Sequence, residues 1–283
     1  MTTSSTFSWN TDNSLNRDYN WSSSIAETLI IAVPNNAHSE RSSSEAMDSC
    51  LRVGQINPSI FYGYDGTDLK TIKTPAHLVG NSVMSMIKVV DCALSITEVA
   101  CALSHIAVWV HCININKPIV VLEHDALMLC SFMDMSYTNS LEYLGHSCEL
   151  DDLYVALGVS DYDHLVEYYQ NAEHLPRPRA RLPVTMVINH NYLFCHGLHA
   201  YAIDPFMARR LLARVLTEGL SNPIDVVLEV TDFTVVQTGI YATQGPASVI
   251  STIDDLGLSL GASVDHTPGQ GRKHMYSIPG VSQ

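Results

Sequence analysis

Three consecutive residues, Glu123, His124 and Asp125, carry the side chains best suited to chemistry in this sequence. They directly follow the apolar run at residues 119–122, which has the pattern of a strand buried on both faces. Alternate side chains of an extended segment point the same way, so the two acids are expected on one side. Two carboxylates together can hold a hard divalent cation through oxygen. The alternative is a solvated strand end with two surface acids, because so short a motif also arises by chance.

Elements expected before residue 70 would form the start of a sheet. Residues 28–33 are a continuous apolar run that Pro34 stops, as in a strand of a parallel sheet. Residues 39–53 have a helical pattern. Residues 60–64 are typical of a second strand, closed by the Asp65-Gly66 turn.

Later elements alternate between helix and strand. Ser95 and Glu98 have the spacing of a capping box and open a helix expected to run to about Asn114. Residues 152–157 and 198–203 are strand-like, and the pairs Asp204-Pro205 and Asn222-Pro223 are typical helix starts. This alternation predicts an α/β fold with a mixed, mostly parallel sheet. Ligands of such sheets bind at the carboxyl edge, where Glu123 and Asp125 would lie.

The length of 283 residues indicates one domain, with boundaries near residues 25 and 255. Residues 1–24 are a polar arm, and residues 256–283 form a tail. Residues 161–183 are polar and contain proline, which favours a surface loop or lid. Its arginines at 177, 179 and 181 would recognise an acidic acceptor, close over a diphosphate, or remain solvated.

The charge balance makes long nucleic acids unlikely partners. The formal net charge is −14, from 15 Lys+Arg against 29 Asp+Glu, and no basic stripe is present. An acidic protein that handles a diphosphate is expected to use a divalent cation as an intermediary.

The cysteines and the hydropathy favour an intracellular protein. Seven cysteines are scattered without a C-x-x-C pair, which indicates a reducing, cytoplasmic setting and buried thiols. No signal peptide is expected at the N-terminus, and no apolar run is expected to reach the ~18 residues of a membrane span. Any membrane association is expected to be peripheral.

The stretch from Ile96 to His105, then Trp109, then the strand ending Leu122-Glu123-His124-Asp125-Ala126, resembles glycosyltransferase family 25. That family includes lipooligosaccharide and collagen galactosyltransferases. Further segments follow the family's order: residues 29–41, 64–66, 152–158, 197–201, 208–212, 223–225, Gln244 and 251–253. The resemblance covers roughly residues 27 to 255.

The resemblance implies a Rossmann-like, nucleotide-sugar-binding domain of the GT-A type. It implies an inverting transfer of a hexose from a nucleotide-sugar to an acceptor hydroxyl, assisted by Mn²⁺ or Mg²⁺. The acceptor would be a glycan, as in lipopolysaccharide biosynthesis, or a hydroxylated protein.

The resemblance also assigns site residues. Asp225 matches the family's Pro-Ile-Asp and is the expected catalytic base, although an Asp in the first turn of a helix also favours the helix dipole. Glu98 is a second catalytic candidate. The donor-binding candidates are Arg41, Asp65, Glu123 and His105, and the metal-ligand candidates are Glu123, Asp125 and His199.

Three positions depart from the family pattern. Thr97 replaces Gly, Leu198 replaces Thr, and His124 replaces the middle acid of Glu-Asp-Asp. His124 would either pack on the opposite face of the strand or shift the metal preference toward transition metals. These departures leave open a lapsed transferase that serves as a sugar-binding or structural component of a larger assembly. A transferase that modifies DNA bases is a third hypothesis, which the acidic charge disfavours.

Overall fold

The computed structural model describes residues 22–68, 71–90, 94–145, 160–171, 186–187, 198–221, 223–224, 234–236 and 241–245. The strands are β1 (Glu27–Ala32), β2 (Pro58–Tyr62), β3 (Ile119–Glu123), β4 (Ala126–Met128), β5 (Leu141–Tyr143), β6 (Met186–Val187), β7 (Ala200–Ile203), β8 (Thr234–Val236) and β9 (Ala242–Gln244). The α-helices are α1 (Ala37–Arg52), α2 (Ile96–Ile115), α4 (Tyr162–Asn171) and α5 (Pro205–Glu218). Two single 3₁₀ turns, η2 (Ala76–Leu78) and η3 (Met84–Met86), lie between β2 and α2.

Seven strands form one sheet in the order β2-β1-β3-β7-β5-β8-β6, and β4 pairs with β9 in a small antiparallel sheet. Strand β1 runs parallel to β2 and β3, β7 runs antiparallel to β3 and β5, and β8 is parallel to β5 but antiparallel to β6. Five strands of this sheet therefore share one direction, and β7 and β6 oppose it. The mixed, mostly parallel sheet expected from the sequence is confirmed.

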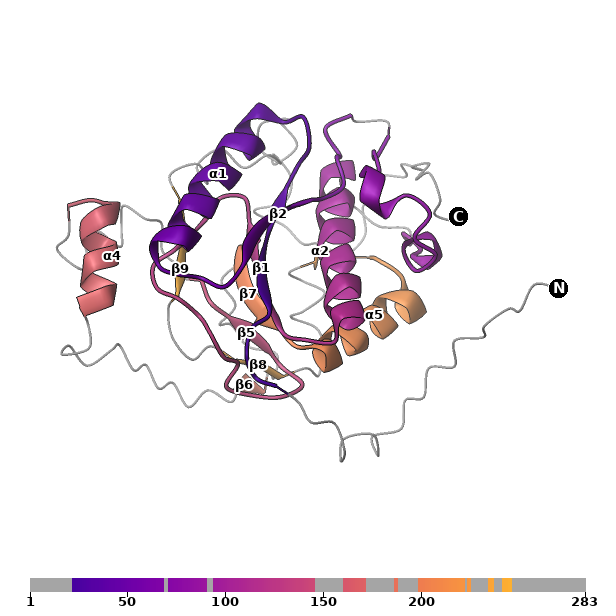
Figure 1. Ribbon diagram of the computed structural model, residues 1–283. Coiled ribbons are helices and arrows are strands. Elements are labelled where there is room, and N and C mark those ends of the chain that lie inside the picture. The colour runs from indigo at the N-terminus through magenta and orange to yellow at the C-terminus, as the bar shows by residue number, and fades with distance from the viewer. Residues whose placement is uncertain are drawn as a thin grey trace.

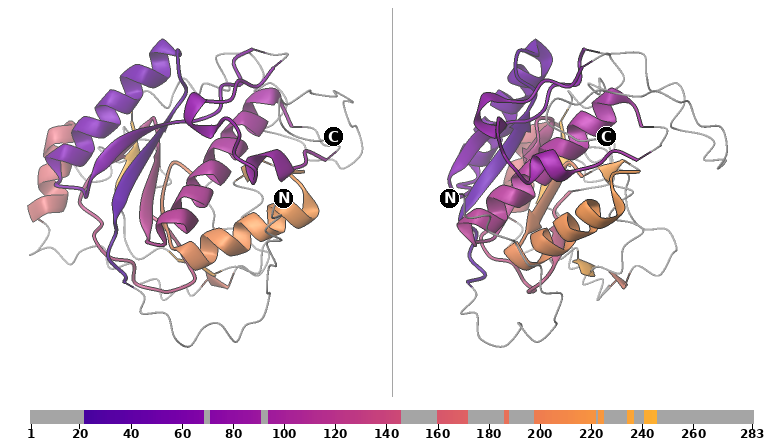
Figure 2. Two further views of the ribbon diagram at one scale, coloured as in Figure 1. Left: turned by 45° about the vertical axis from the view of Figure 1, so that its right-hand side comes forward. Right: turned by 90° about the vertical axis from the view of Figure 1, so that its right-hand side faces the viewer.

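The two faces of the sheet are covered by different helices, as Figures 1 and 2 show. Helices α2 and α5 pack together on one face, and α1 lies on the other with β4 and β9. Successive side chains of β3 alternate between two cores: Val121 belongs to the core under α2, and Val120 and Leu122 to the core under α1. This alternation fixes the face on which each residue at the end of β3 lies.

Helix α2 begins at the capping box that the sequence predicts. The Ser95 hydroxyl accepts from the Glu98 amide at 3.2 Å, and a Glu98 carboxylate oxygen accepts from the Ser95 amide at 2.6 Å. The helix ends at Asn116, whose left-handed φ of 51° closes the last turn.

Helix α2 also has the length and composition of a membrane span, contrary to the expectation that no apolar run approaches one. However, 78% of its apolar 18-residue window is buried inside the fold, as in the core helix of a globular domain. This helix is therefore weak support for a span.

The remaining expected elements are partly confirmed. Strand β2 begins two residues earlier than expected, and α5 begins at Pro205 with Asp204 as its N-cap, whose carboxylate accepts from the Met207 amide at 2.7 Å. The expected strand at 152–157, the helix start at Asn222, the polar arm up to residue 21 and the tail from 256 lie outside the described residues.

The expectation of a loop over residues 161–183 is wrong for its first part, which forms helix α4. An Asp161 carboxylate oxygen accepts from the His164 amide at 3.0 Å, so Asp161 caps the helix. Val166 is buried, and Tyr162 and Asp163 contact Arg52 at the end of α1. The arginines at 177, 179 and 181 lie outside the described residues.

Candidate active site

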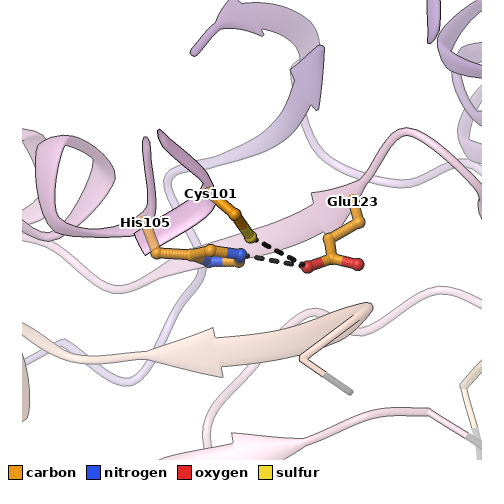
Figure 3. A group of neighbouring side chains, drawn as sticks. All are labelled: Cys101, His105 and Glu123. Carbon is orange, nitrogen blue, oxygen red and sulfur yellow. Dashed lines mark hydrogen bonds and ion pairs between the residues drawn. The ribbon is translucent and has the colours of Figure 1, made fainter. Parts of the chain in front are cut away.

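Glu123 ends the central strand β3 on the face that α2 covers. Glu123 is two residues after Val121 and so lies on the same side of the strand. Its side chain meets two residues of α2, as Figure 3 shows. Its Oε1 lies 3.1 Å from His105 Nε2 and 4.0 Å from Cys101 Sγ. Because Oε2 makes no hydrogen bond to the described part of the chain and the side chain is 27% exposed, one oxygen remains available to a ligand.

A buried row of hydrogen bonds holds His105 in place. Trp109 Nε1 donates to Tyr201 Oη at 3.1 Å, and Tyr201 Oη lies 2.9 Å from His105 Nδ1. All three side chains are fully buried, so the imidazole that faces Glu123 has one fixed orientation.

Histidines around Glu123 favour its ionised form. Burial alone would raise the pKa of Glu123, but the hydrogen bond from His105 and the nearby charges of His105, His124 and His199 lower it overall. Glu123 is therefore a permanent anion at neutral pH.

Asp125 lies in the turn between β3 and β4, in a different environment. Its Oδ1 is buried and has no hydrogen-bond partner in the described ranges, and its main-chain oxygen accepts from the Gly245 amide at 2.7 Å. Burial, and then repulsion from Glu123, raise the pKa of Asp125 to about 7. A buried acceptor without a donor, next to a second carboxylate, is an arrangement that a bound cation would complete.

His124 lies in the same turn, and its ring contacts helix α1. By the alternation of the chain it falls on the same side as Val120 and Leu122. Its ring meets the ring of His38 in α1 edge-on, with the ring centroids 6.0 Å apart. Burial lowers the pKa of His124, and His38 lowers it further against the opposing effect of Glu123. Of the two roles considered for His124, packing on the opposite face is the one that this position favours.

His199 precedes β7 and lies beside Glu123. Its main-chain oxygen accepts from the Glu123 amide at 2.8 Å. His199 is two residues before Tyr201 and so falls on the same face of the sheet, the one that α2 covers. Its Nδ1 lies 3.1 Å from Tyr143 Oη. Gly145 packs so closely on the ring that a Cβ there would lie 2.1 Å from Nε2. The main chain of His199 therefore lies beside Glu123, and the role of its ring as a metal ligand stays a prediction.

Glu98 and Asp65 lie near the N-terminal end of α2. Glu98 shares a helix face with Cys101 and His105, at i, i+3 and i+7. The turn after Asp65 packs on the same helix end, because a Cβ at Gly66 would lie 2.9 Å from the main-chain oxygen of Ile96.

Both of these carboxylates have structural partners. Asp65 accepts from the amide and hydroxyl of Thr67 and lies 3.4 Å from Lys73 Nζ. Burial alone would raise the pKa of Asp65, but these groups lower it overall. Their capping and turn-forming contacts account for both positions, and their catalytic and donor-binding roles stay predictions.

Two candidates are not brought to the site. Arg41 is exposed on α1, with no contact to the two acids in the described structure. Asp225, the expected base, lies outside the described residues.

Cys101 and Tyr201 also contact the site, and neither was predicted from the sequence as a site residue. The spacing of Cys101 and His105, one helical turn apart, was a signal that could have identified the first. Tyr201 could not be identified, because its contact depends on β7 lying antiparallel beside β3.

A mixed, mostly parallel sheet whose central strand ends in two acids is the arrangement of a Rossmann-like glycosyltransferase. The chain belongs to glycosyltransferase family 25, since the model of that family, described as a lipopolysaccharide biosynthesis protein, matches residues 36–228. This match covers more than half of the 283 residues and includes Glu123, Asp125, His199 and Asp225. No curated protein matches the chain.

Family membership identifies the protein as a glycosyltransferase with a sugar donor and an acceptor as partners.

Proposed function

We propose that this protein is an inverting, metal-dependent glycosyltransferase that moves a hexose from a nucleotide-sugar to an acceptor hydroxyl. The observation that carries the proposal is the pair of acids at the end of β3. One is ionised at neutral pH, and the other has a buried Oδ1 that finds no hydrogen-bond donor among the described residues. The potential metal ligands fit a hard divalent cation such as Mn²⁺, because they comprise carboxylate oxygens and an imidazole. Glu123, Asp125 and His199 would hold the ion.

A divalent cation at this place supplies Lewis-acid stabilisation of the charge that develops on the leaving nucleotide diphosphate. The chain's own residues supply the rest of the site. His105, fixed by Tyr201, orients Glu123, and the ionised Glu123 keeps the local charge negative. Asp225 takes the proton of the acceptor hydroxyl. At the same time the hydroxyl oxygen bonds to the anomeric carbon of the sugar, and the bond from that carbon to the diphosphate breaks. Family membership and the match at Pro223-Ile224-Asp225 support this assignment.

The proposed setting is the cytoplasm, with an acceptor glycan of lipopolysaccharide type. The family description supports the acceptor class. The free, buried thiols of Cys50 and Cys112 support a reducing compartment.

The test begins with Mn²⁺ alone and the full chain. A bound ion at 100 times its Kd stabilises the fold by about 2.7 kcal/mol, which appears as a higher Tm. We expect Asp125→Asn to abolish this rise. The matched control is Asp48→Asn, which removes an exposed carboxylate of α1 that has no hydrogen bond within the described residues. An equal rise in both variants would exclude Asp125 as a ligand.

The second step uses a panel of nucleotide-sugars with an acceptor hydroxyl. Release of nucleoside diphosphate, lost in Asp225→Asn, would support the transferase, and NMR of the product's anomeric centre would test inversion. A protein that ignores every donor and both Mn²⁺ and Mg²⁺ would instead be a lapsed transferase with a sugar-binding or structural role.

A further inference from the structure

Glu123 belongs to a second group of potential metal ligands, besides the pair that it forms with Asp125. Cys101 and His105 project from adjacent turns of α2 toward Glu123 Oε1 (Figure 3). The three potential ligand atoms, a thiol sulfur, an imidazole nitrogen and a carboxylate oxygen, all lie within 4.8 Å of one another. None of these contacts involves Asp125.

This set has the composition and spacing of a zinc site. Zn²⁺ is bound by Cys, His and carboxylate at about 2.0–2.3 Å, so tetrahedral ligand atoms lie about 3.3–3.7 Å apart. The observed separations are 3.1 Å from His105 Nε2 to Glu123 Oε1 and 4.0 Å from Cys101 Sγ to the same oxygen. These two separations lie within about half an ångström of the ideal spacing. The third, between the Cys101 sulfur and the His105 nitrogen, is at most 4.8 Å, so the two α2 side chains have to draw together around the ion.

We propose that Cys101, His105 and Glu123 form a binding site for a thiophilic divalent cation of the zinc class. Occupation of this site places a positive charge on the carboxylate of Glu123, which would also hold the catalytic cation, and like charges at one carboxylate repel. The cation therefore acts as an inhibitor of the catalytic site, and this regulatory part rests on the proposed function.

The surroundings of His105 suit metal binding. A histidine ligand usually engages its second nitrogen in a hydrogen bond, which fixes the tautomer. Here Tyr201 Oη lies 2.9 Å from Nδ1, and Trp109, a donor only, leaves Tyr201 able to accept a second hydrogen. On binding, the Nε2 proton that His105 donates to Glu123 goes to solvent, while Nδ1–H donates to Tyr201, so the Nε2 lone pair is free to bond to the cation.

One side of the site is open to an incoming ion. The His105 side chain is only 1% exposed, whereas that of Glu123 is 27% exposed and Cys101 is half-buried. Three protein ligands leave a fourth position for water, as in zinc sites that are not purely structural. On binding, the S–H bond of Cys101 breaks, its proton goes to solvent, and the sulfur bonds to the metal.

The experiment uses Co²⁺ as a spectroscopic substitute for Zn²⁺, without any sugar substrate. Tetrahedral Co²⁺ bound to a thiolate gives a sulfur-to-metal charge-transfer band and intense visible bands. We expect both in the wild-type chain, and their loss when Zn²⁺ is added in slight excess. Wild-type protein without the charge-transfer band would overturn the proposal.

Substitutions assign the ligands. Cys101→Ser is expected to abolish the charge-transfer band, and Cys130→Ser, which removes another half-buried thiol, is expected to keep it. Circular dichroism and Tm confirm that each variant is folded, and Cys101→Ala provides a second variant should the serine disturb α2. A band that persists without the Cys101 thiol, or disappears with that of Cys130, assigns the metal elsewhere and contradicts the site.

Two of the variants already named separate this proposal from the proposed function. Asp125→Asn is expected to keep the Co²⁺ band while losing the Tm rise with Mn²⁺, and Cys101→Ser is expected to do the opposite. Wild-type protein that shows the Co²⁺ band but no Tm rise with Mn²⁺ would refute the metal-dependent transferase. Wild-type protein that shows the Tm rise but no Co²⁺ band would refute the zinc-class site. Inhibition then requires Zn²⁺ to weaken Mn²⁺ binding in wild-type protein but not in Cys101→Ser.

Discussion

At the scale of single residues, the two acids of the site differ in protonation although they are two positions apart. His105 on α2, with His124 and with His199 just before β7, lowers the pKa of Glu123. Asp125 Oδ1 has no donor within the described residues, and burial and Glu123 raise the pKa of Asp125 to about 7. Two titratable groups whose pKa values are pushed apart are a common feature of functional sites. Glu123 is therefore ionised at neutral pH, and Asp125 changes charge near physiological pH.

This difference predicts how Mn²⁺ affinity depends on pH. A metal binds the ionised carboxylate, so protons compete with Mn²⁺ below the pKa of Asp125, which is raised to about 7. We expect Mn²⁺ to bind about tenfold more weakly at pH 6 than at pH 8, as one competing proton requires. Calorimetric titration at both pH values measures this ratio, and a flat profile would show that Asp125 is ionised throughout or is no ligand.

At the scale of elements, helix α2 could be largely predicted from the sequence. The spacing of Ser95 and Glu98 predicted where the helix begins, and the spacing of its apolar residues predicted its length. The apolar run at residues 119–122 predicted β3, with Glu123 at its end. These features are local, and local patterns determine local structure. The acids at the carboxyl edge of the sheet were predicted for the same reason.

Features that depend on strand order could not be predicted. The antiparallel insertion of β7 beside β3 brings His199 and Tyr201 to Glu123, across nearly eighty residues of sequence. The contact of His124 with His38 depends on the packing of α1, and helix α4 formed where polarity and proline favoured a loop. Tertiary packing decides such cases, and a sequence pattern does not encode it directly.

The capping box of α2 yields a prediction that separates structure from catalysis at Glu98. Ser95→Ala is expected to destabilise the fold by about 1 kcal/mol, because the Glu98 amide loses its acceptor. Ser44→Ala, which removes an exposed hydroxyl of α1, is the control and should cost less than about 0.5 kcal/mol. Urea unfolding measures both changes.

Glu98→Gln retains a side-chain oxygen that can accept from the Ser95 amide. Stability is therefore expected to stay close to that of the wild type. A large fall in turnover at unchanged stability would support the catalytic role of Glu98, and unchanged turnover would leave it as a cap alone.

At the scale of the whole molecule, the acidic charge limits the partners. With a net charge of −14, the protein repels the phosphate backbone, and we expect no shift of duplex DNA in a gel at about 50 mM salt. A shift that weakens steeply as salt increases would revive the hypothesis of a transferase acting on DNA bases.

The pairing of β9 with β4 has a consequence for how the protein becomes active during synthesis. Gly245 donates to the main-chain oxygen of Asp125, so the turn that carries this acid is completed by a segment made about 120 residues later. A nascent chain that has folded only β1 to β3 would display its acids on an unfinished turn. Competence to transfer sugar is therefore acquired late, after translation has passed β9.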